Sequence, residues 1–236
     1  MAETTRLALP LLAPAQAQKH VTVNEALVRL DALTQMVLAG TGTTLPPVSP
    51  VEGEVHAVGA GASGAWSGQD GKVAIFLNSG WAFLMPSPGW RAWDAVAGVP
   101  VTFDGIAWVE GAGAMAASGA GFLHRTVETD HPLTSGATSI VTAAIPGDAI
   151  VYGVTGRVLA SIGGAVSFEI GVPGSANRYG SGFGTSAGSW TRGITGSPLA
   201  YYAPTDLILT AGGGAFDGSG SIRLAIHYAE LTLPRP

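Results

Sequence analysis

A single helical pattern limits what this chain can fold into, and it lies between Leu7 and Leu38. Apolar residues recur there at the spacing of one helix face, at Ala26, Leu30, Leu33 and Val37. Thr22-Val23-Asn24-Glu25 has the form of a capping box and Gly40 suits a left-handed cap, so we expect a helix of about 16 residues. No second pattern of this kind follows. Because parallel strands need crossover connections, usually helices, the sequence excludes a parallel α/β fold.

The second half of the chain alternates apolar and polar residues with a period of two. The alternation begins after Phe122 and is clear in residues 166–172 and 207–211. Half-buried strands of this kind, separated by turns at nearly regular spacing, are typical of a β-sandwich or jelly roll. We therefore predict an all-β chain, with an N-terminal α-helix, a small tryptophan-rich β-domain and an antiparallel β-sandwich of the jelly-roll type.

Four regions are expected along the chain. Residues 1–40 form an anchoring segment and the helix, and residues 41–110 form the small β-domain, with five of the six tryptophans. Residues 111–121, rich in glycine and alanine, are expected to be a flexible linker, and residues 122–236 form the sandwich. Strands of the small domain are predicted at 54–58, 72–77, 81–85, 99–103 and 106–109, with tight hairpins at Asn78-Ser79-Gly80 and Asp104-Gly105, the second of type I′.

Composition narrows the classes of function. Charged residues make up 11% of the chain, against about 25% in an average protein, and lysine occurs only at Lys19 and Lys72. Scarce lysine fits extensive burial between subunits, since interfaces are depleted in this residue. The net charge of -5 argues against a nucleic-acid partner, which requires a basic face. With no cysteine, disulfide and thiolate chemistry are excluded.

The start of the chain imitates a signal peptide without matching one. Its apolar run from Leu7 to Leu12 is short, Pro10 interrupts it, and Glu3 opposes the basic lead that secretion signals have. No stretch approaches the roughly 18 apolar residues that a membrane-spanning helix needs. We therefore expect neither a cleaved signal nor membrane insertion.

Residues 6–110 carry a resemblance to a known family. It rests on two segments, LPLLAPAQAQKHVTVNEALVRLDAL and EGEVHAVGAGASGAWSGQDGKVAIFLNSGWAFLMPSPGWRAWDAVAGVPVTFDGIAWV. They resemble a domain family of unknown biochemical function from bacterial prophages and gene transfer agents, where the domain occurs in tail fibres and head spikes. The resemblance implies a homotrimer, so we expect the stripe Ala26, Leu30, Leu33 and Val37 to face sister helices rather than the chain's own sheet. The tryptophan-rich sheet is the alternative partner for that stripe.

Catalytic chemistry finds little support. Glu128 and Asp130 are two residues apart, so on a strand they share a face about 7 Å from each other, as a glycosidase pair or a Ca²⁺ site requires. The plainer interpretation is a solvated strand end. The histidines His124, His131 and His227 show no metal-ligand spacing. We therefore expect no enzyme, no cofactor and no resident metal.

Aromatic residues in glycine- and serine-rich loops favour a carbohydrate platform. Flat rings stack on the apolar faces of pyranose sugars, and arginines donate hydrogen bonds to hydroxyls. The candidate residues are Trp190, Tyr202, Tyr179, Arg178, Arg192 and, in the small domain, Trp66. The alternative is that these rings close loops over the sandwich or pack against a neighbouring subunit.

The predicted function follows from the family resemblance and from the aromatic residues in the loops. The resemblance implies a structural protein of a phage-like particle, a tail fibre or head spike, made without a signal peptide and extracellular after lysis. We expect its N-terminus to contact other particle proteins and its sandwich to bind host cell-surface polysaccharide. A capsule-degrading glycosidase or esterase is one alternative, and a virion protein without any ligand is another.

Overall fold

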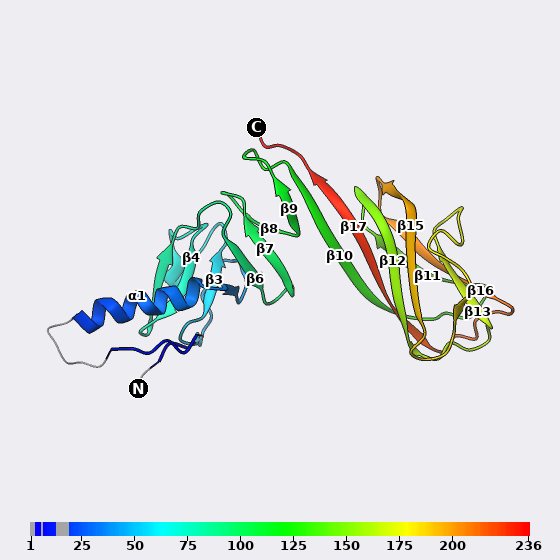
Figure 1. Ribbon diagram of the computed structural model, residues 1–236, viewed down its shortest axis with the longest axis horizontal. Coiled ribbons are helices and arrows are strands. Elements are labelled where there is room, and N and C mark those ends of the chain that lie inside the picture. The colour runs from blue at the N-terminus through cyan, green and yellow to red at the C-terminus, as the bar shows by residue number, and fades with distance from the viewer. Residues whose placement is uncertain (1–2, 6, 13–18) are drawn as a thin grey trace. The chain divides into compact units, whose positions relative to one another are not determined.

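The computed structural model describes residues 3–5, 7–12 and 19–236, which form two compact units, Met1–Ala112 and Gly113–Pro236 (Figure 1). Strands dominate both units, and one α-helix occurs in the described part of the chain. The predicted all-β fold is therefore confirmed.

The first unit contains two four-stranded sheets. One has the order β1-β6-β7-β8 and the other β2-β3-β4-β5. Their strands are β1 (Val37–Leu38), β6 (Arg91–Asp94), β7 (Val99–Phe103), β8 (Trp108–Glu110), β2 (Thr41–Thr43), β3 (Val55–Val58), β4 (Val73–Leu77) and β5 (Gly80–Leu84). The short strands β1 and β2, which follow the helix, pair in parallel with β6 and β3, and the other pairs are antiparallel.

The helix α1 runs from Lys19 to Leu33, so both of its predicted ends are wrong. It begins three residues before Thr22, which therefore lies inside the helix and cannot cap it. Glu25 instead forms a salt bridge with Arg29, at 2.6 Å across one helical turn. At the C-terminal end the left-handed residue is Gln35, with φ 49°, and Val37 already belongs to β1.

The helix uses a face other than the predicted stripe to cover the sheets. Val28, Ala32 and Leu33 pack into the core of the first unit, whereas Ala26 is exposed and Leu30 is 55% exposed. Of the predicted stripe only Leu33 contributes to that core. The stripe was expected to lie on one helix face throughout. That expectation is wrong, because the chain leaves the helix before Val37.

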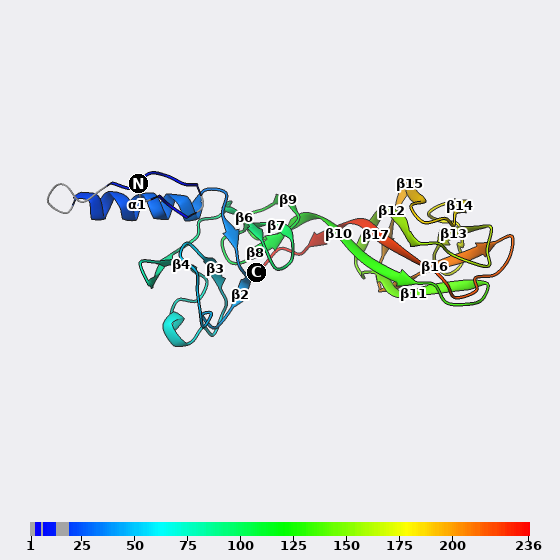
Figure 2. The same ribbon diagram turned by 90° about the horizontal axis from the view of Figure 1, so that it is seen from below.

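The N-terminal segment lies alongside α1 (Figure 2). The Thr4 hydroxyl donates a 2.8 Å hydrogen bond to the buried carboxylate of Asp31. Asn24 exchanges two hydrogen bonds with the backbone of Leu12, at 2.8 and 3.0 Å. These polar contacts occupy a further side of the helix, and its exposed apolar residues are Val21, Val23, Ala26 and Leu30.

Strands β3 and β4 are buried on both faces. Val73, Ile75 and Leu77 of β4 face the main core, while Ala74 faces a second cluster built around Trp66. Trp66 comes from the glycine-rich loop 59–72, is fully buried, and packs edge-on against Trp81 with ring centroids 5.0 Å apart. The loop is held in place by the Asp70 carboxylate, which accepts two backbone N–H bonds at 3.0 Å. The loop therefore covers the second face of β3 and β4 and buries the Trp66 ring against it.

The two predicted hairpins have different outcomes. Asn78 and Ser79 both have positive φ between β4 and β5, so this two-residue turn has the type I′ form. The predicted two-residue turn at Asp104-Gly105 is wrong, because Phe103 pairs with Trp108 across a four-residue loop. There the Asp104 carboxylate accepts the backbone N–H groups of the two residues that end the loop. This local bonding replaces the tight turn.

The second unit is a jelly roll. Its sheets have the orders β15-β12-β17-β10-β9 and β11-β16-β13-β14, and successive strands from β10 to β13 alternate between them, as do β15 to β17. Their bounds are β9 (Ala112–Met115), β10 (Gly121–Pro132), β11 (Thr138–Ile145), β12 (Ala149–Ala160), β13 (Ser167–Gly171), β14 (Phe183–Gly184), β15 (Trp190–Tyr201), β16 (Thr205–Gly212) and β17 (Ser221–Thr232). The predicted flexible linker at 111–121 is wrong, since most of it forms β9 and the turn into β10.

The core of the jelly roll lies between its two sheets. Val154, Phe168, Leu209 and Leu224 are fully buried there, each on an inward position of its strand. The outer face of the β15-β12-β17-β10 sheet is exposed at Trp190 and Arg192 of β15 and at Arg223 of β17, which alternate with buried residues on the same strands.

Candidate functional site

A groove of about 440 Å³ lies on the outer face of the β15-β12-β17-β10 sheet, and we call it the Trp190 groove. Each of the four strands contributes to it, because every second side chain of an antiparallel strand points to the same face. Its lining residues are Glu128, Thr155, Gly156, Arg157, Leu159, Trp190, Thr191, Arg192, Arg223 and Ala225.

Strand register places the polar and aromatic residues of the groove in rows. In one row Trp190 lies opposite Arg157, Arg157 opposite Arg223, and Arg223 opposite Asp130. The next row along the strands has Arg192, Thr155, Ala225 and Glu128 in the same four positions. The small side chains in the middle of this second row leave the depression between its two ends.

One end of the groove combines an indole ring with two arginines. Trp190 is 61% exposed, and the guanidinium of Arg192 lies 5.7 Å from the centre of its ring, a cation–π distance. Arg157 is exposed and donates a 3.1 Å hydrogen bond to the backbone carbonyl of Gly188, in the loop that leads into β15. The ring therefore keeps a large open surface beside two cations.

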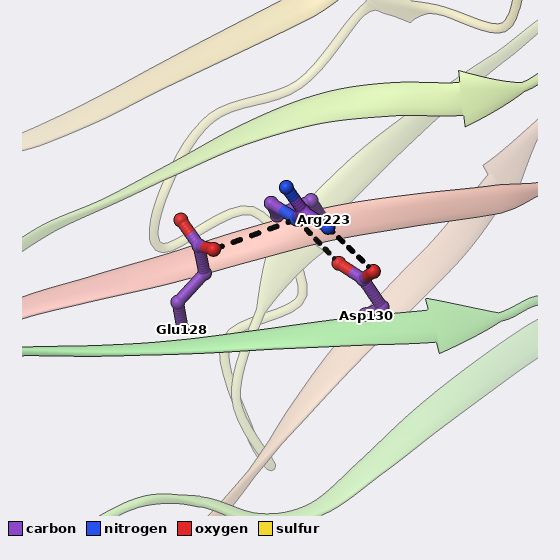
Figure 3. A network of polar contacts seen from close by, with 3 residues as sticks. All are labelled: Glu128, Asp130 and Arg223. Atoms are coloured by element: carbon purple, nitrogen blue, oxygen red, sulfur yellow. Dashed lines mark hydrogen bonds and ion pairs between the residues drawn. The ribbon is translucent and has the colours of Figure 1, made fainter. Parts of the chain in front are cut away.

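The other end holds an ion-pair network (Figure 3). Arg223 donates two hydrogen bonds to Asp130, at 2.6 and 2.7 Å, and lies 3.5 Å from Glu128. The hydrogen bonds from Arg223 lower the pKa of Asp130, and the same bonds, together with the two negative charges, raise the pKa of Arg223. Asp130 is thus held in its charged form, which is unlike a general acid, whose pKa is usually raised.

The structure separates the four predicted sugar-binding residues that are exposed into three groups. Trp190 and Arg192 line the groove together. Tyr202 is 86% exposed but lines a different depression, of about 460 Å³, next to Leu231 and Leu233. Arg178 is exposed in the loop after β13, and it lines neither depression.

Trp66 and Tyr179 were wrongly predicted to contact a ligand. Trp66 is fully buried under its own loop, as described above. Tyr179 is 1% exposed, and its hydroxyl shares a 2.8 Å hydrogen bond with that of Tyr201 inside the jelly-roll core. Burial, with the bond to Tyr201, raises the pKa of the Tyr179 phenol. Both rings serve the interior, so their places in glycine-rich loops were misleading.

Arg157 and Arg223 line the groove but were not predicted as binding residues. Both stand at outward positions of alternating strands, and two-residue periodicity assigns them to an exposed face. What the periodicity could not supply is the partner across the strand, because register between β12, β15 and β17 joins residues more than 30 positions apart. Glu128 and Asp130 were singled out, but as a pair without the arginine between them.

Within the described residues, the histidines and carboxylates do not gather into a metal site. No group of three such side chains suited to a metal ion occurs in the described residues. His131 accepts or donates a 2.8 Å hydrogen bond with Ser139, and burial lowers its pKa. His227 lies between the hydroxyls of Thr126 and Thr155, at 3.3 and 2.9 Å. Among the helices of residues 3–5, 7–12 and 19–236, none is long and apolar enough to cross a membrane.

Comparison with known proteins identifies a domain in the first unit. Residues 23–109 match the model of a family described as "Protein of unknown function (DUF2793)". The match covers less than half of the chain and lies within the residues that carry the resemblance described above. A domain of unknown biochemical function near the N-terminus is therefore confirmed.

Solved structures with some similarity come from two phage capsids. One is a chain of the cyanophage Pam1 capsid asymmetric unit, 23% identical, with a TM-score of 0.35, covering 50% of this chain and 91% of the other. The second is a chain of the capsid of Ralstonia phage GP4, 16% identical, with a TM-score of 0.37, covering 52% and 88%. Scores at this level do not establish a common fold. Curated protein sequences show no significant match.

Proposed function

We propose that this chain is a structural, receptor-binding component of a phage-like particle, of the tail-fibre or head-spike kind, which attaches to host cell-surface polysaccharide through the Trp190 groove. The particle assignment rests on the resemblance of residues 6–110 to virion proteins of prophages and gene transfer agents. The Trp190 groove itself is the observation that carries the binding role.

Three features of the groove support sugar binding. It is open and elongated across four strands, which suits a polymer rather than a small molecule enclosed in a pocket. Trp190 offers an exposed ring for the apolar face of a pyranose. Arginines at both ends and the carboxylate of Glu128 at one end provide donors and acceptors for sugar hydroxyls.

Weak individual sites suffice for this role when copies are linked. We propose a homotrimer, assembled through the apolar residues Val23, Ala26 and Leu30 that α1 leaves exposed. Linked binding sites raise avidity about 10²–10⁴-fold without new contacts. The N-terminal unit would then hold the chain on the particle, with the jelly rolls free to bind the cell.

A capsule-degrading enzyme is the rival proposal, and no observation favours it. Its natural catalytic pair is Glu128 and Asp130, which share Arg223. Incubation of the full chain with capsular polysaccharide tests it. Shortening of the polymer, abolished by Glu128→Gln or Asp130→Asn, would replace binding by hydrolysis as the function.

The binding proposal is tested with labelled full-length chain and cells of one bacterial strain, with and without capsule. We expect binding to encapsulated cells and a loss of at least tenfold in Trp190→Ala, about 1.4 kcal/mol of binding free energy. Tyr202→Ala is the matched control, since it removes an even more exposed ring outside the groove and should leave binding unchanged. Equal binding to cells that lack capsule, or full binding by Trp190→Ala, contradicts the proposal.

A further inference from the structure

We propose that the Trp190 groove selects an acidic polysaccharide, and that Arg157 and Arg192 recognise the carboxylate of a uronic-acid-type sugar stacked at Trp190. This inference rests on the proposed function and names the class of sugar that the groove takes.

The arginines at the two ends of the groove differ in whether a carboxylate pairs with them. Arg223 is neutralised by Asp130 and Glu128. Arg157 contacts an uncharged backbone carbonyl, and Arg192 contacts the uncharged ring of Trp190. In the described part of the chain no ion pair joins either arginine to a carboxylate. Two cations without a carboxylate partner therefore occupy diagonal positions on the neighbouring strands β12 and β15, on a chain whose net charge is -5.

Strand geometry places both arginines within reach of one sugar ring. Arg157 is directly opposite Trp190 on the neighbouring strand, at the usual cross-strand separation of about 5 Å between Cβ atoms. Arg192 follows Trp190 on the same face of β15, about 7 Å along the strand. A pyranose on the indole ring thus has a guanidinium on two sides. Guanidinium groups bind carboxylates with two parallel hydrogen bonds, which fixes the orientation of the ring.

The opposite end of the groove argues against a densely charged polymer. Glu128 is exposed and lines the groove three strand spacings from Arg192 in the same row, about 14 Å across the sheet. A chain with a charge on every unit, such as a nucleic acid or a heavily sulfated glycan, would place anions against this carboxylate. A repeat in which an acidic sugar alternates with neutral sugars fits better, because neutral hydroxyls can donate to Glu128.

The test uses the full-length chain and the capsular polysaccharide of the strain that it binds, in three forms. The first is untreated, the second has its carboxylates chemically reduced to alcohols, and the third has its phosphate groups removed. We expect reduction of the carboxylates to weaken binding at least tenfold, as measured by titration calorimetry or biolayer interferometry, while removal of phosphate has no effect. Raising the salt concentration should weaken binding of the untreated polymer alone, because salt screens charge pairs.

Variants of the chain assign the effect to the groove. Arg157→Gln and Arg192→Gln should each lower affinity for the untreated polymer about tenfold and leave affinity for the reduced polymer unchanged. Arg178→Gln is the matched control, with the same loss of charge at an exposed site of the same unit outside the groove. Thermal unfolding of all three variants should match that of the parent chain, since the three side chains are exposed.

Each outcome decides between the two proposals. Untreated and reduced polymers that bind equally, with Trp190→Ala still defective, overturn the acidic-sugar inference and leave the polysaccharide proposal intact. Loss on removal of phosphate identifies a different oxyanion and also overturns the inference. If Arg178→Gln loses as much affinity as Arg157→Gln, the attraction is a general charge effect, and the assignment to these two arginines is wrong.

Discussion

Trp66 and Trp190 begin in similar sequence surroundings and end in opposite environments. Both lie in or next to stretches rich in glycine and serine, where an exposed ring is the natural expectation. Trp66 is fully buried and Trp190 is 61% exposed. The difference comes from what happens to the second face of each sheet. In the first unit, the loop that contains Trp66 folds over β3 and β4; in the second, the outer face at Trp190 stays uncovered.

The comparison shows how a glycine-rich loop can bury a large ring. Loop 59–72 is anchored at both ends to the sheet, with the Asp70 carboxylate bridging its first turn. Its glycines at positive φ allow the chain to reverse direction closely enough to bring Trp66 down onto Ala74. The stretch before Trp190 instead leads directly into the edge strand β15. No loop of the described residues covers the Trp190 ring, which stays 61% exposed.

The largest expected effect is the difference in stability between the variants Trp66→Ala and Trp190→Ala. Trp66→Ala should lower the free energy of unfolding of the first unit by about 3–5 kcal/mol, because it leaves a cavity in a closed cluster. Trp190→Ala should change the stability of the second unit by no more than about 0.5 kcal/mol, since the ring is mostly in solvent. Denaturant unfolding, followed for each unit separately by hydrogen exchange, measures both. Equal losses in the two variants would break the comparison.

A middle-sized effect tests two tyrosines of the jelly roll in the same way. Tyr179→Phe removes a buried hydroxyl from its 2.8 Å hydrogen bond with Tyr201 and should cost about 1 kcal/mol. Tyr202→Phe, one residue beyond the same bond and 86% exposed, should have no measurable effect. Thermal unfolding of the two variants checks this pair. A cost for Tyr202→Phe as large as that for Tyr179→Phe would show that Tyr202 is covered in solution.

The smallest effect on stability belongs to helix α1. Leu30→Glu should change the stability of the folded chain by no more than about 0.5 kcal/mol, because Leu30 is exposed, and yet should dissociate the proposed trimer. Val96→Glu is the control, an apolar-to-acidic change at an exposed turn of the same unit, and should leave the mass unchanged. Light scattering coupled to size exclusion gives the mass. A parent chain that is monomeric, or a trimer that survives Leu30→Glu, contradicts the role of this surface.

Helix α1 was predictable from the local sequence, but the face that it buries was not. The helix could be predicted because apolar residues recur at helical spacing between polar ones. The local pattern did not indicate which face of the helix is buried. Val28 and Ala32 meet the core because the chain leaves the helix at Leu33 and enters β1, which pairs with β6 more than 50 residues away. Ala26, Leu30 and Val37 gave a more regular stripe, yet that long-range pairing, absent from the local pattern, decides which side of the helix turns inward.

The sequence by itself determined that the second unit is a jelly roll and that residues such as Arg157 point outward, because a two-residue period assigns each side chain to a face wherever one face is buried. Trp190, expected in a loop, instead begins strand β15. Only the tertiary structure decided which outward residues meet. Pairing of β15, β12, β17 and β10 brought Trp190, Arg157 and Arg192 into one groove with Arg223. Of these arginines, Arg223 forms ion pairs with Asp130 and Glu128. Cross-strand register depends on contacts between distant segments, so no local pattern encodes it.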